Sequence, residues 1–445
     1  MTDRRRIKRQ PLLAGFVPLE DRTAPAVFTA TLDPAVDPTG AVAEIVGFFA
    51  KVNTNGEAQD TIDLFTAGKY VFTTAFDRFD GGTALPVFVA SGPADKLTVN
   101  GVGATFSRSS SNTESFRFLR AQGNFSTGRV ATLVVNGVTF SGGNAFDTTF
   151  PSRSGSIFGA TQNGGAIRVD QALLYTNGVR FIGNQSAGDG GAVSLGNTRE
   201  DLILGGHKFI DTIFDANIAK GKGGAVTVDL AGPVTFTNST ISNNQATKGA
   251  GGVDAFTTSV LFDRSTLTAN KGDSGAVKVV GPVDVRDTLV RKNIATGIAT
   301  AGIAGTSITA TRSTFADNTN TGSVTGGSAL NGSKITVVNS TIYRNVGGVA
   351  AIQATLGTVS IQFSTVTNNT STFGIPSGAG IGADSLLISN TIVAKNQNAD
   401  LSSTIADIQA NTIVTSGFNF IGKAPANFKG ATANCLHFAH SKALF

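Results

Sequence analysis

One eleven-residue pattern recurs along this chain, and it constrains the fold more than any other feature. The best copy runs from Val234 to Asn244 (V-T-F-T-N-S-T-I-S-N-N): two apolar residues two positions apart, a turn residue, a third apolar residue and a closing Asn. Looser copies end at Asn217 and Asn184, and a degraded one ends near Asn144. From Asn217 onward the closing residues lie 23 to 27 residues apart, at Asn217, Asn244, Asn270, Asn293, Asn318, Asn345, Asn369 and Asn396. A repeat of this length predicts a solenoid whose units stack along one axis.

The spacing inside the repeat predicts short strands joined by sharp corners. Apolar residues two apart place their side chains on one side of a strand, and the polar residue that follows ends the strand. A further strand begins after each of the related tetrapeptides Gly164–Ile167, Gly190–Val193, Gly223–Val226 and Ser274–Val277. Each repeat therefore supplies about three strands, and repeats stacked about 4.8 Å apart would form a parallel β-helix of roughly twelve coils.

The closing Asn has two structural reasons to recur. Asn tolerates the left-handed backbone that a sharp corner needs, and stacked Asn amides can hydrogen-bond along the solenoid. A residue repeated in every coil is structural first, and binding of glycans or metal by these Asn is the weaker alternative. Asn238 and Asn339 begin glycosylation sequons, but both occupy turn positions of the repeat, so we interpret them as turns.

Composition excludes several classes of protein. The formal net charge is +5, and the first ten residues carry +4 of it, which leaves about +1 on the other 435 residues and no basic face for nucleic acid. Cys435 is the only cysteine, so no intramolecular disulfide and no multi-cysteine metal site can form. No apolar run approaches the roughly 18 residues that a membrane span requires.

Four regions follow from the order of these features. Residues 1–26 form a basic sorting segment, either signal-like or disordered, and 27–96 contain an N-terminal cap and the first strands. The cap is a helix over Gly40–Asn53, where Val42, Ile45, Val46 and Phe49 form one apolar stripe. Coils occupy 97–422, with inserted loops at Ser152–Asn163 and Asn197–Gly206, and an irregular tail covers 423–445.

Several of these segments resemble known bacterial repeats. Phe181–Asn184, Phe214–Asn217 and Phe315–Asn318 read F-x-x-N and, with the Gly-Gly-Ala tetrapeptides, resemble the repeats of polymorphic outer membrane proteins. Ser389–Asn396 resembles a motif of right-handed parallel β-helix proteins, which have the pectin lyase-like fold.

Two shorter segments resemble parts of exported proteins. Phe418–Gly422 is similar to part of the choice-of-anchor Q region, whose Pro- and Gly-rich remainder is missing here, and Leu19–Ala26 resembles a segment of exported planctomycete proteins. Together these resemblances imply an all-β, right-handed parallel β-helix with a short N-terminal helical cap, on an exported bacterial protein at the cell surface or outside the cell.

The repeat does not align catalytic side chains, so we name no catalytic, cofactor-binding or metal-binding residue and expect no cofactor. Asp287 and Asp211 occupy the turn position, which neighbouring repeats fill with Arg, Asn or Gly. His207 fills the first apolar position, where a packed or edge histidine is a better interpretation than a base. We interpret a second set of acidic residues as surface or turn residues, and a catalytic or calcium cluster is the weaker alternative: Asp254, Asp263, Asp273 and Asp284.

Two classes of function remain. The first is a non-enzymatic, adhesin-like protein that is exported and monomeric. Its faces bind polysaccharide or cell-surface glycans but not nucleic acid. A purely structural role in the envelope has the same sequence features. The alternative is a carbohydrate-active enzyme, a polysaccharide lyase or glycosidase, acting through inserted loops at 144–217. Whether the chain is an enzyme stays open, with the non-enzymatic role favoured. Flat Ser, Thr and Asn faces favour the first class, and a groove lined by charges from three consecutive coils favours the second.

Overall fold

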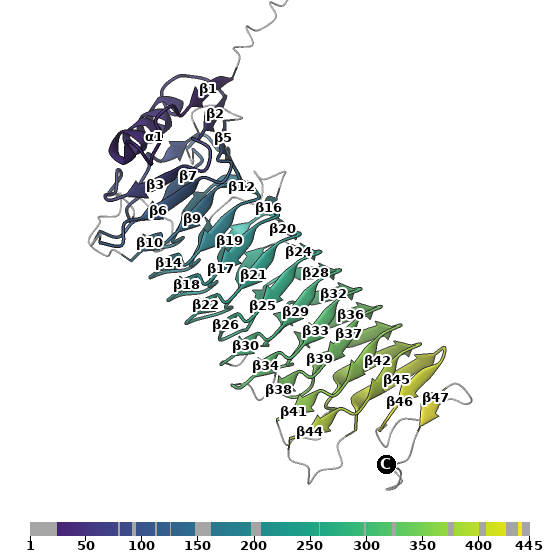
Figure 1. The fold of residues 1–445 in the computed structure, drawn as a ribbon. Helices are drawn as coiled ribbons and strands as arrows, with labels where there is room; N and C mark the ends of the chain where they lie inside the picture. Colours follow the sequence, from purple (N-terminus) through teal and green to yellow (C-terminus); the bar gives the residue numbers. More distant parts are fainter. Residues whose placement is uncertain are drawn as a thin grey trace, which may run out of the picture.

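A computed structural model shows a long rod of stacked coils with one helix at its N-terminal end (Figure 1). It describes residues 25–423, with gaps at 79–80, 91–94, 112–113, 125, 147–161, 197–205, 258, 298–299, 323–325, 373–377 and 400–405, and the backbone of 435–437. The predicted sorting segment therefore lies almost entirely outside the described residues. So do most of the two predicted inserted loops and nearly all of the predicted irregular tail.

Every strand named below pairs in parallel with the equivalent strand of the next coil, and a typical coil holds four strands. The strands form four ladders that run along the rod. Ladder one follows the Gly-Gly-Ala segments and contains β4 (Phe88–Val89), β7 (Leu119–Gln122), β11 (Ile167–Asp170), β15 (Val193–Gly196), β19 (Val226–Ala231), β23 (Val253–Thr257), β27 (Val277–Val279), β31 (Ile303–Ala304) and β35 (Leu330–Asn331). Ladder two contains the first strand of the repeat: β1 (Ala26–Thr29), β2 (Gln59–Asp63), β5 (Lys96–Asn100), β8 (Ala131–Asn136), β12 (Ala172–Asn177), β16 (His207–Ile210), β20 (Val234–Thr237), β24 (Val260–Asp263), β28 (Pro282–Arg286), β32 (Ser307–Thr311) and β36 (Lys334–Val338).

Near the C-terminal end, ladders one and two merge into long strands that serve both: β39 (Ile352–Gln362), β42 (Ile381–Ser389) and β45 (Ile408–Ser416). Ladder three contains the second strand of the repeat: β3 (Lys69–Phe72), β6 (Thr105–Arg108), β9 (Thr139–Ser141), β13 (Arg180–Ile182), β17 (Ile213–Asp215), β21 (Thr240–Ser242), β25 (Thr266–Thr268), β29 (Leu289–Arg291), β33 (Thr314–Ala316), β37 (Thr341–Tyr343), β40 (Thr365–Thr367), β43 (Ile392–Ala394), β46 (Asn419–Ile421) and β47 (Cys435–His437). Ladder four contains two-residue strands: β10 (Asn144–Ala145), β14 (Gln185–Ser186), β18 (Ile218–Ala219), β22 (Gln245–Ala246), β26 (Lys271–Gly272), β30 (Ile294–Ala295), β34 (Thr319–Asn320), β38 (Val346–Gly347), β41 (Thr370–Ser371) and β44 (Gln397–Asn398).

This arrangement is the predicted parallel β-helix, with three differences. The sequence predicts about three strands per coil, and the fourth is missed because two residues cannot show an alternating pattern. The ladders also begin at β1 and β2, upstream of residue 97, where the coils are predicted to start. β47 lies within the segment predicted as an irregular tail and pairs with β46.

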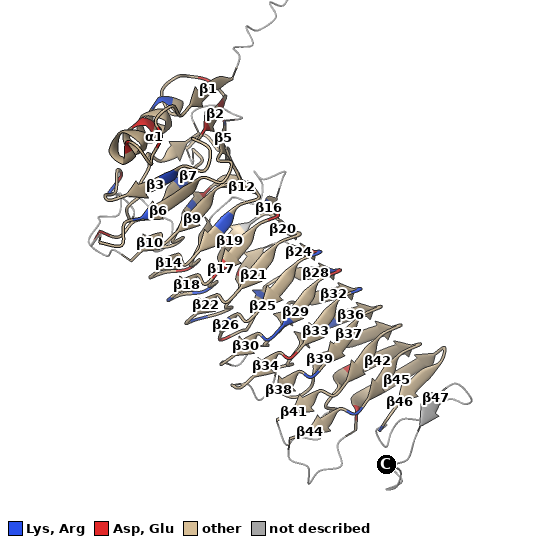
Figure 2. Cartoon of the chain, viewed as in Figure 1, with Lys and Arg blue, Asp and Glu red and all other residues tan. Residues whose placement is uncertain are grey.

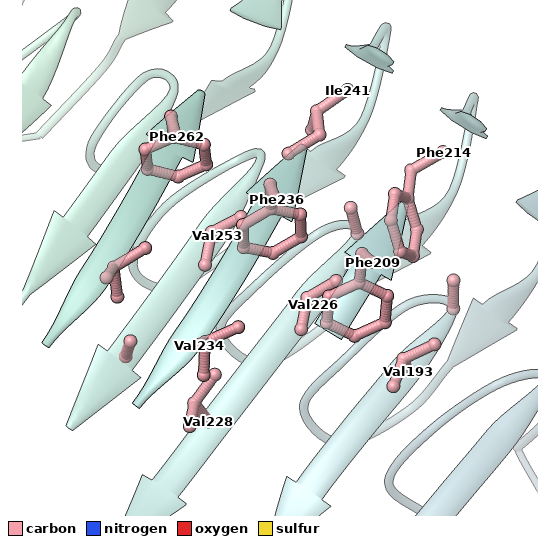
Figure 3. Close-up of a cluster of buried hydrophobic side chains, with 14 of the residues drawn as sticks. Val193, Phe209, Phe214, Val226, Val228, Val234, Phe236, Ile241, Val253 and Phe262 are labelled. Carbon is pink, nitrogen blue, oxygen red and sulfur yellow. The ribbon is translucent and has the colours of Figure 1, made fainter. Parts of the chain in front are cut away.

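Inward-facing side chains repeat from coil to coil and form a continuous core. Phe209, Phe236 and Phe262 occupy the same position in consecutive coils, and their rings stack with centroids 4.8 and 5.0 Å apart (Figure 3). Phe181 and Phe214 stack likewise in ladder three, at 4.8 Å. Because parallel pairing in register sets like residues one coil apart, the spacing of the ladder also sets the spacing of the rings.

The closing Asn form a hydrogen-bonded column inside the rod. Asn293 is fully buried; its Nδ2 donates to Asn318 Oδ1 at 2.9 Å and to the Leu267 carbonyl of the previous coil at 3.0 Å. Its own Oδ1 accepts the backbone N–H and the Nδ2 of Asn270, both at 3.0 Å. The same pattern runs through Asn184, Asn217, Asn244, Asn270, Asn293, Asn318, Asn345, Asn369 and Asn396. The predicted amide column is confirmed.

The other predicted reason for this Asn is wrong. The left-handed backbone lies on the preceding residue, as at Ala269 (φ 55°) and Lys292 (φ 55°), and not on the closing Asn itself. Each buried amide donates in both directions along the rod, so the column fixes the orientation of the Asn. The residue before it, which faces solvent at the corner, takes the left-handed backbone instead. The degraded copy is also displaced: Gly143, not Asn144, aligns with Asn184 and donates its N–H to Asn184 Oδ1 at 2.9 Å.

The column ends on a carboxylate at the C-terminal end. Asp407 Oδ1 accepts the backbone N–H and the Nδ2 of Asn396 at 2.7 and 2.8 Å, and its Oδ2 accepts the Lys423 N–H at 2.7 Å. Each Nδ2 in the column donates one of its hydrogen bonds toward this end. A carboxylate, which only accepts, therefore finishes the column without leaving a buried donor unpaired.

The helix α1 (Pro38–Val52) covers the N-terminal end, as predicted. Asp37 caps it by accepting the Gly40 N–H at 2.8 Å, and Pro38 occupies the first turn. The buried face consists of Ala41, Ile45, Phe49 and Val52. None of the helices that the structure describes is long and apolar enough to cross a membrane.

We expect Asn293→Ala to lower the free energy of unfolding by about 3 kcal/mol, because two donors of Asn270 lose their buried acceptor and a cavity replaces the amide. Guanidinium chloride unfolding followed by circular dichroism measures this change. The matched control is Gln245→Ala, at an exposed position next to the column, where we expect a change within about 0.5 kcal/mol. Equal effects of the two substitutions would contradict a special role for the column.

Candidate functional site

Two outward faces of the rod carry polar side chains in register. The first lies on ladder three, where Thr240, Thr266, Thr314, Thr341 and Thr365 occupy the same outward position in five of six consecutive coils; Leu289 fills the sixth. All five are half-buried. We name these five threonines the hydroxyl face. Where two of these threonines lie in adjacent coils, their strands are about 4.8 Å apart, and Leu289 interrupts the series once.

The hydroxyl face is rigid and uncharged in its main column. A Thr side chain has restricted χ1 freedom, so each hydroxyl is held by the strand beneath it. The adjacent outward column holds Ser242, Thr268 and Thr367, but also Arg291 and Tyr343. The guanidinium of Arg344 lies 4.8 Å from the centroid of the Tyr343 ring, which adds one aromatic surface to this face. Hydroxyls of this kind can donate and accept hydrogen bonds but have no proton to exchange near neutral pH.

The second face lies on ladder one, and we name it the charged face: Arg120, Arg168, Asp170, Asp254 and Lys278. Asp170 accepts hydrogen bonds from the Nε atoms of both arginines, on Oδ2 from Arg120 and on Oδ1 from Arg168, each at 2.9 Å. The three side chains are at most 5% exposed. Two cations and one anion therefore form a buried cluster between β7 and β11.

Asp254 lies farther along the same ladder, opposite Lys278 of the next coil. Burial raises the pKa of this carboxyl, and the Asp189 carboxylate raises it further. The Ala250 N–H, which donates to Oδ2 at 2.9 Å, and the ammonium groups of Lys278 and Lys222 act in the opposite direction. A carboxyl with a raised pKa can exchange a proton more readily near neutral pH, a property that burial also gives to Asp60 and Asp407.

The structure separates the four acidic residues that the sequence grouped. Asp263 and Asp284 face outward on ladder two, paired with Arg264 (2.8 Å) and Arg286, whereas Asp254 belongs to ladder one. Asp273 follows β26 in the turn that leads to the next ladder-one strand. Among the residues described, no group of three or more His, Cys, Asp or Glu is placed to hold a metal ion.

The two acidic residues at the turn position each have a partner in an adjacent coil. Arg312 donates to Asp287 through Nε and a terminal nitrogen, both at 2.7 Å, and this hydrogen bonding lowers the pKa of the Asp287 carboxyl. Asn238 donates to Asp211. Charged residues are scattered along the rod as short blue and red segments, and most of the described ribbon is tan, the colour of the other residues (Figure 2). These two corner pairs connect neighbouring coils and engage the side chains of Asp287 and Asp211.

His207 is a core residue, which agrees with the interpretation of a packed histidine and not with that of a base. It is 1% exposed, it aligns with Val234, and burial lowers its pKa to about 4. The Leu174 N–H donates to Nδ1 at 3.2 Å, so the proton of the neutral ring is on Nε2, which has no hydrogen-bond partner. This histidine cannot act as a base on a substrate outside the rod.

The sequence missed the cluster of Arg120, Arg168 and Asp170. Alternation within I-R-V-D (Ile167–Asp170) would have placed Arg168 and Asp170 on the outer side of their strand. The partner Arg120 is 50 residues upstream of Asp170 and follows no Gly-Gly-Ala segment, so only the pairing of β7 with β11 brings them together.

We expect His207→Val to make the free energy of unfolding depend less on pH below neutrality. The unfolded chain binds a proton at His207 below about pH 6.5 and the folded chain only below about pH 4, so the wild type loses roughly 3 kcal/mol as the pH falls through this window. Guanidinium unfolding at pH 7 and at pH 4.5 measures it: the difference between the two pH values should shrink in the variant. The outward-facing neighbour provides the control, since Lys208→Thr should keep the pH dependence of the wild type.

Asp170→Ala should destabilise the N-terminal half of the rod by about 3–5 kcal/mol, because two buried guanidinium groups lose their shared counter-ion. Thermal unfolding measures the effect. The control Asp287→Ala removes a solvent-exposed ion pair and should leave the melting temperature nearly unchanged. A cluster that tolerates alanine at 170 would be solvated and would contradict the burial described above.

Comparison with known proteins supports the architecture. Residues 202–384, less than half of the chain, match the family model described as "Right handed beta helix region". No curated protein and no solved structure matches the chain. The finer resemblances, to polymorphic outer membrane protein repeats and to the choice-of-anchor Q region, remain predictions. The ladders and this match together establish an all-β β-helix repeat protein, a right-handed parallel β-helix with a short helical cap at its N-terminal end.

Proposed function

We propose that this chain is an exported, non-enzymatic protein that binds an extended polysaccharide along the hydroxyl face. The fold is compatible with surface or glycan-related roles. The observation that carries the proposal is the register of the threonines, five of which repeat at one outward position in six consecutive coils. A polymer of sugar residues also repeats its hydroxyl groups along one axis.

Hydroxyl groups suit this partner because both sides can donate and accept. A single such hydrogen bond contributes little net free energy in water, about 1 kcal/mol. Repetition along a rigid rod changes the balance, since the second and later contacts of one polymer are intramolecular and cost little further translational entropy. The stiff χ1 of Thr lowers the ordering cost further.

The ring of Tyr343 supports the same proposal. It lies beside Thr341 and one coil from Thr367 on the hydroxyl face, half-buried and backed by the Arg344 guanidinium. An aromatic face beside hydroxyl donors can pack against the apolar C–H surface of a sugar while the hydroxyls bind its rim.

Location outside the cell belongs to the proposal and is supported by sequence alone. The basic residues near the N-terminus precede a short apolar stretch and Ala24–Ala26, the order of parts found in a secretory signal peptide. A single cysteine in 445 residues fits an exported bacterial protein.

A second candidate is a carbohydrate-active enzyme working at the charged face. Cations at Arg120 and Arg168 would attract an acidic sugar, and Asp254, with its raised pKa, would exchange a proton. Three features place it second. Both arginines are almost completely buried, both already bind Asp170, and Asp254 on β23 lies three strands beyond β11 on ladder one.

The double variant Thr314→Val/Thr341→Val tests the hydroxyl face. We expect retention on an immobilised polysaccharide to weaken at least about tenfold, because two hydroxyls are lost without a change of shape. A panel of acidic and neutral polysaccharides, read for both retention and chain length, identifies the ligand class.

Thr309→Val/Thr336→Val is the matched control. It changes the same residue type in the same two coils, but on ladder two, and should bind as the wild type does. Shortening of the polymer with time would support the enzyme instead. No retention on any polysaccharide would overturn the proposal and leave a structural rod.

A further inference from the structure

Large apolar side chains gather on the surface of the last coils. Phe363 is 57% exposed, Leu387 43%, Ile392 46%, Val414 55% and Phe418 76%. We name these five residues the apolar patch. They lie on β42, β43 and β45 and on the corner between ladders two and three.

The patch is contiguous across three coils. Leu387 and Val414 are direct partners in β42 and β45. The Phe363 N–H donates to the Ser389 carbonyl at 3.1 Å, and the Phe418 N–H donates to Asn390 Oδ1 at 3.0 Å. Phe363 and Phe418 therefore lie on either side of Asn390 along one corner, with the aliphatic side chains beside them.

The earlier coils show that the fold does not need apolar residues at these positions. At the ladder-two position of Leu387, the preceding coils carry Asp284, Thr309, Thr336 and Ser360. At the corner position of Phe363 they carry Arg264, Asp287, Arg312 and Asn339, and at the ladder-three position of Ile392 they carry Thr314, Thr341 and Thr365. One β-helix thus accepts polar and apolar residues alike here. Single apolar residues also occur in these columns in earlier coils, at Leu261 and Leu289, but the last coils bring five exposed ones together, which folding does not require.

Burial on a partner is the physical reason for which such a patch persists on a protein surface. A fully exposed side chain of this size presents on the order of 150–200 Å², so five side chains about half exposed present roughly 450 Å² of apolar surface. A stable interface buries about 800 Å² per partner, of which about 56–65% is apolar. The patch therefore supplies the apolar part of one interface of ordinary size.

We propose that the apolar patch is the contact between two copies of this chain. The patch carries no charge, and Ser360, Ser389, Asn390 and Ser416 around it offer donors and acceptors for a polar rim. A twofold axis through it sets the patch against itself without bringing like charges together. The charged corner pairs, such as Asp287 with Arg312, lie two or more coils away from Asn390 and outside the contact. The proposed dimer differs from the monomer expected from the sequence.

Sedimentation equilibrium of the full chain over a range of concentrations tests the dimer. The variant Phe363→Asn/Leu387→Thr takes its residues from equivalent positions of earlier coils, so the fold can accept both. We expect the wild type to dimerise and the double variant to need at least about tenfold more protein for the same fraction of dimer.

Leu356→Asn is the matched control: this leucine is 91% exposed in the same region of the chain, but it lies between the two halves of β39 and outside the patch. It should dimerise as the wild type does, and circular dichroism melts should show that all three proteins fold. A wild type that stays monomeric up to high concentration overturns the proposal. If the patch variant then also loses retention on polysaccharide, the patch is a glycan-binding surface instead. Dimerisation that survives in the patch variant also overturns it.

Discussion

The column of buried Asn side chains is the interaction on which the rest of the rod depends. Each amide accepts from the coil before it and donates to the coil after it, so the pairing register of every coil is fixed by its neighbours. Backbone ladders alone would allow a strand to slip by a residue, which would turn its whole apolar set outward. A buried amide that slips loses both partners and cannot find water. Specificity of register therefore comes from a polar column, while the apolar core supplies most of the stability.

The column also explains why strain collects at the corners. With the Asn committed to the interior, the residue before it takes a left-handed backbone, as at Ala269 and Lys292, although neither is glycine. Such a conformation costs a non-glycine residue on the order of 1–2 kcal/mol. The cooperative amide column and the apolar core beside it offset this cost. Side chains at this corner are thereby held outward, where Arg344 reaches Asp317 of the preceding coil.

The interior of every coil is mainly apolar and the described coils from Asn184 to Asn396 share the amide column, so the chemical differences that a partner can meet lie on the outside of the rod. A charged cluster around Asp170 lies toward the N-terminal end, hydroxyls follow ladder three through the middle, and apolar side chains cover the last coils. We infer that polysaccharide binding and self-association use the second and third of these surfaces. The two roles are physically compatible, because a dimer joined near one end leaves most of each hydroxyl face open and doubles the number of faces that one polymer can meet.

The sequence by itself determined the architecture. A period of 23 to 27 residues, the spacing of apolar residues and the recurring Asn predict stacked coils, their inward-facing residues and the amide column, because each coil repeats the same constraint. The helix over Pro38–Val52 was equally visible, since its apolar stripe has helical spacing.

Only the tertiary structure decided which outward residues meet. Arg120 reaches Asp170 across 50 residues, Phe363 and Phe418 flank Asn390 from different coils, and Gly143 rather than Asn144 continues the column. Outward positions take no part in the core, so no pattern constrains them, and segments of variable length between coils hide their register. Pairing between strands, which depends on contacts distant in sequence, supplies that register and with it both candidate surfaces.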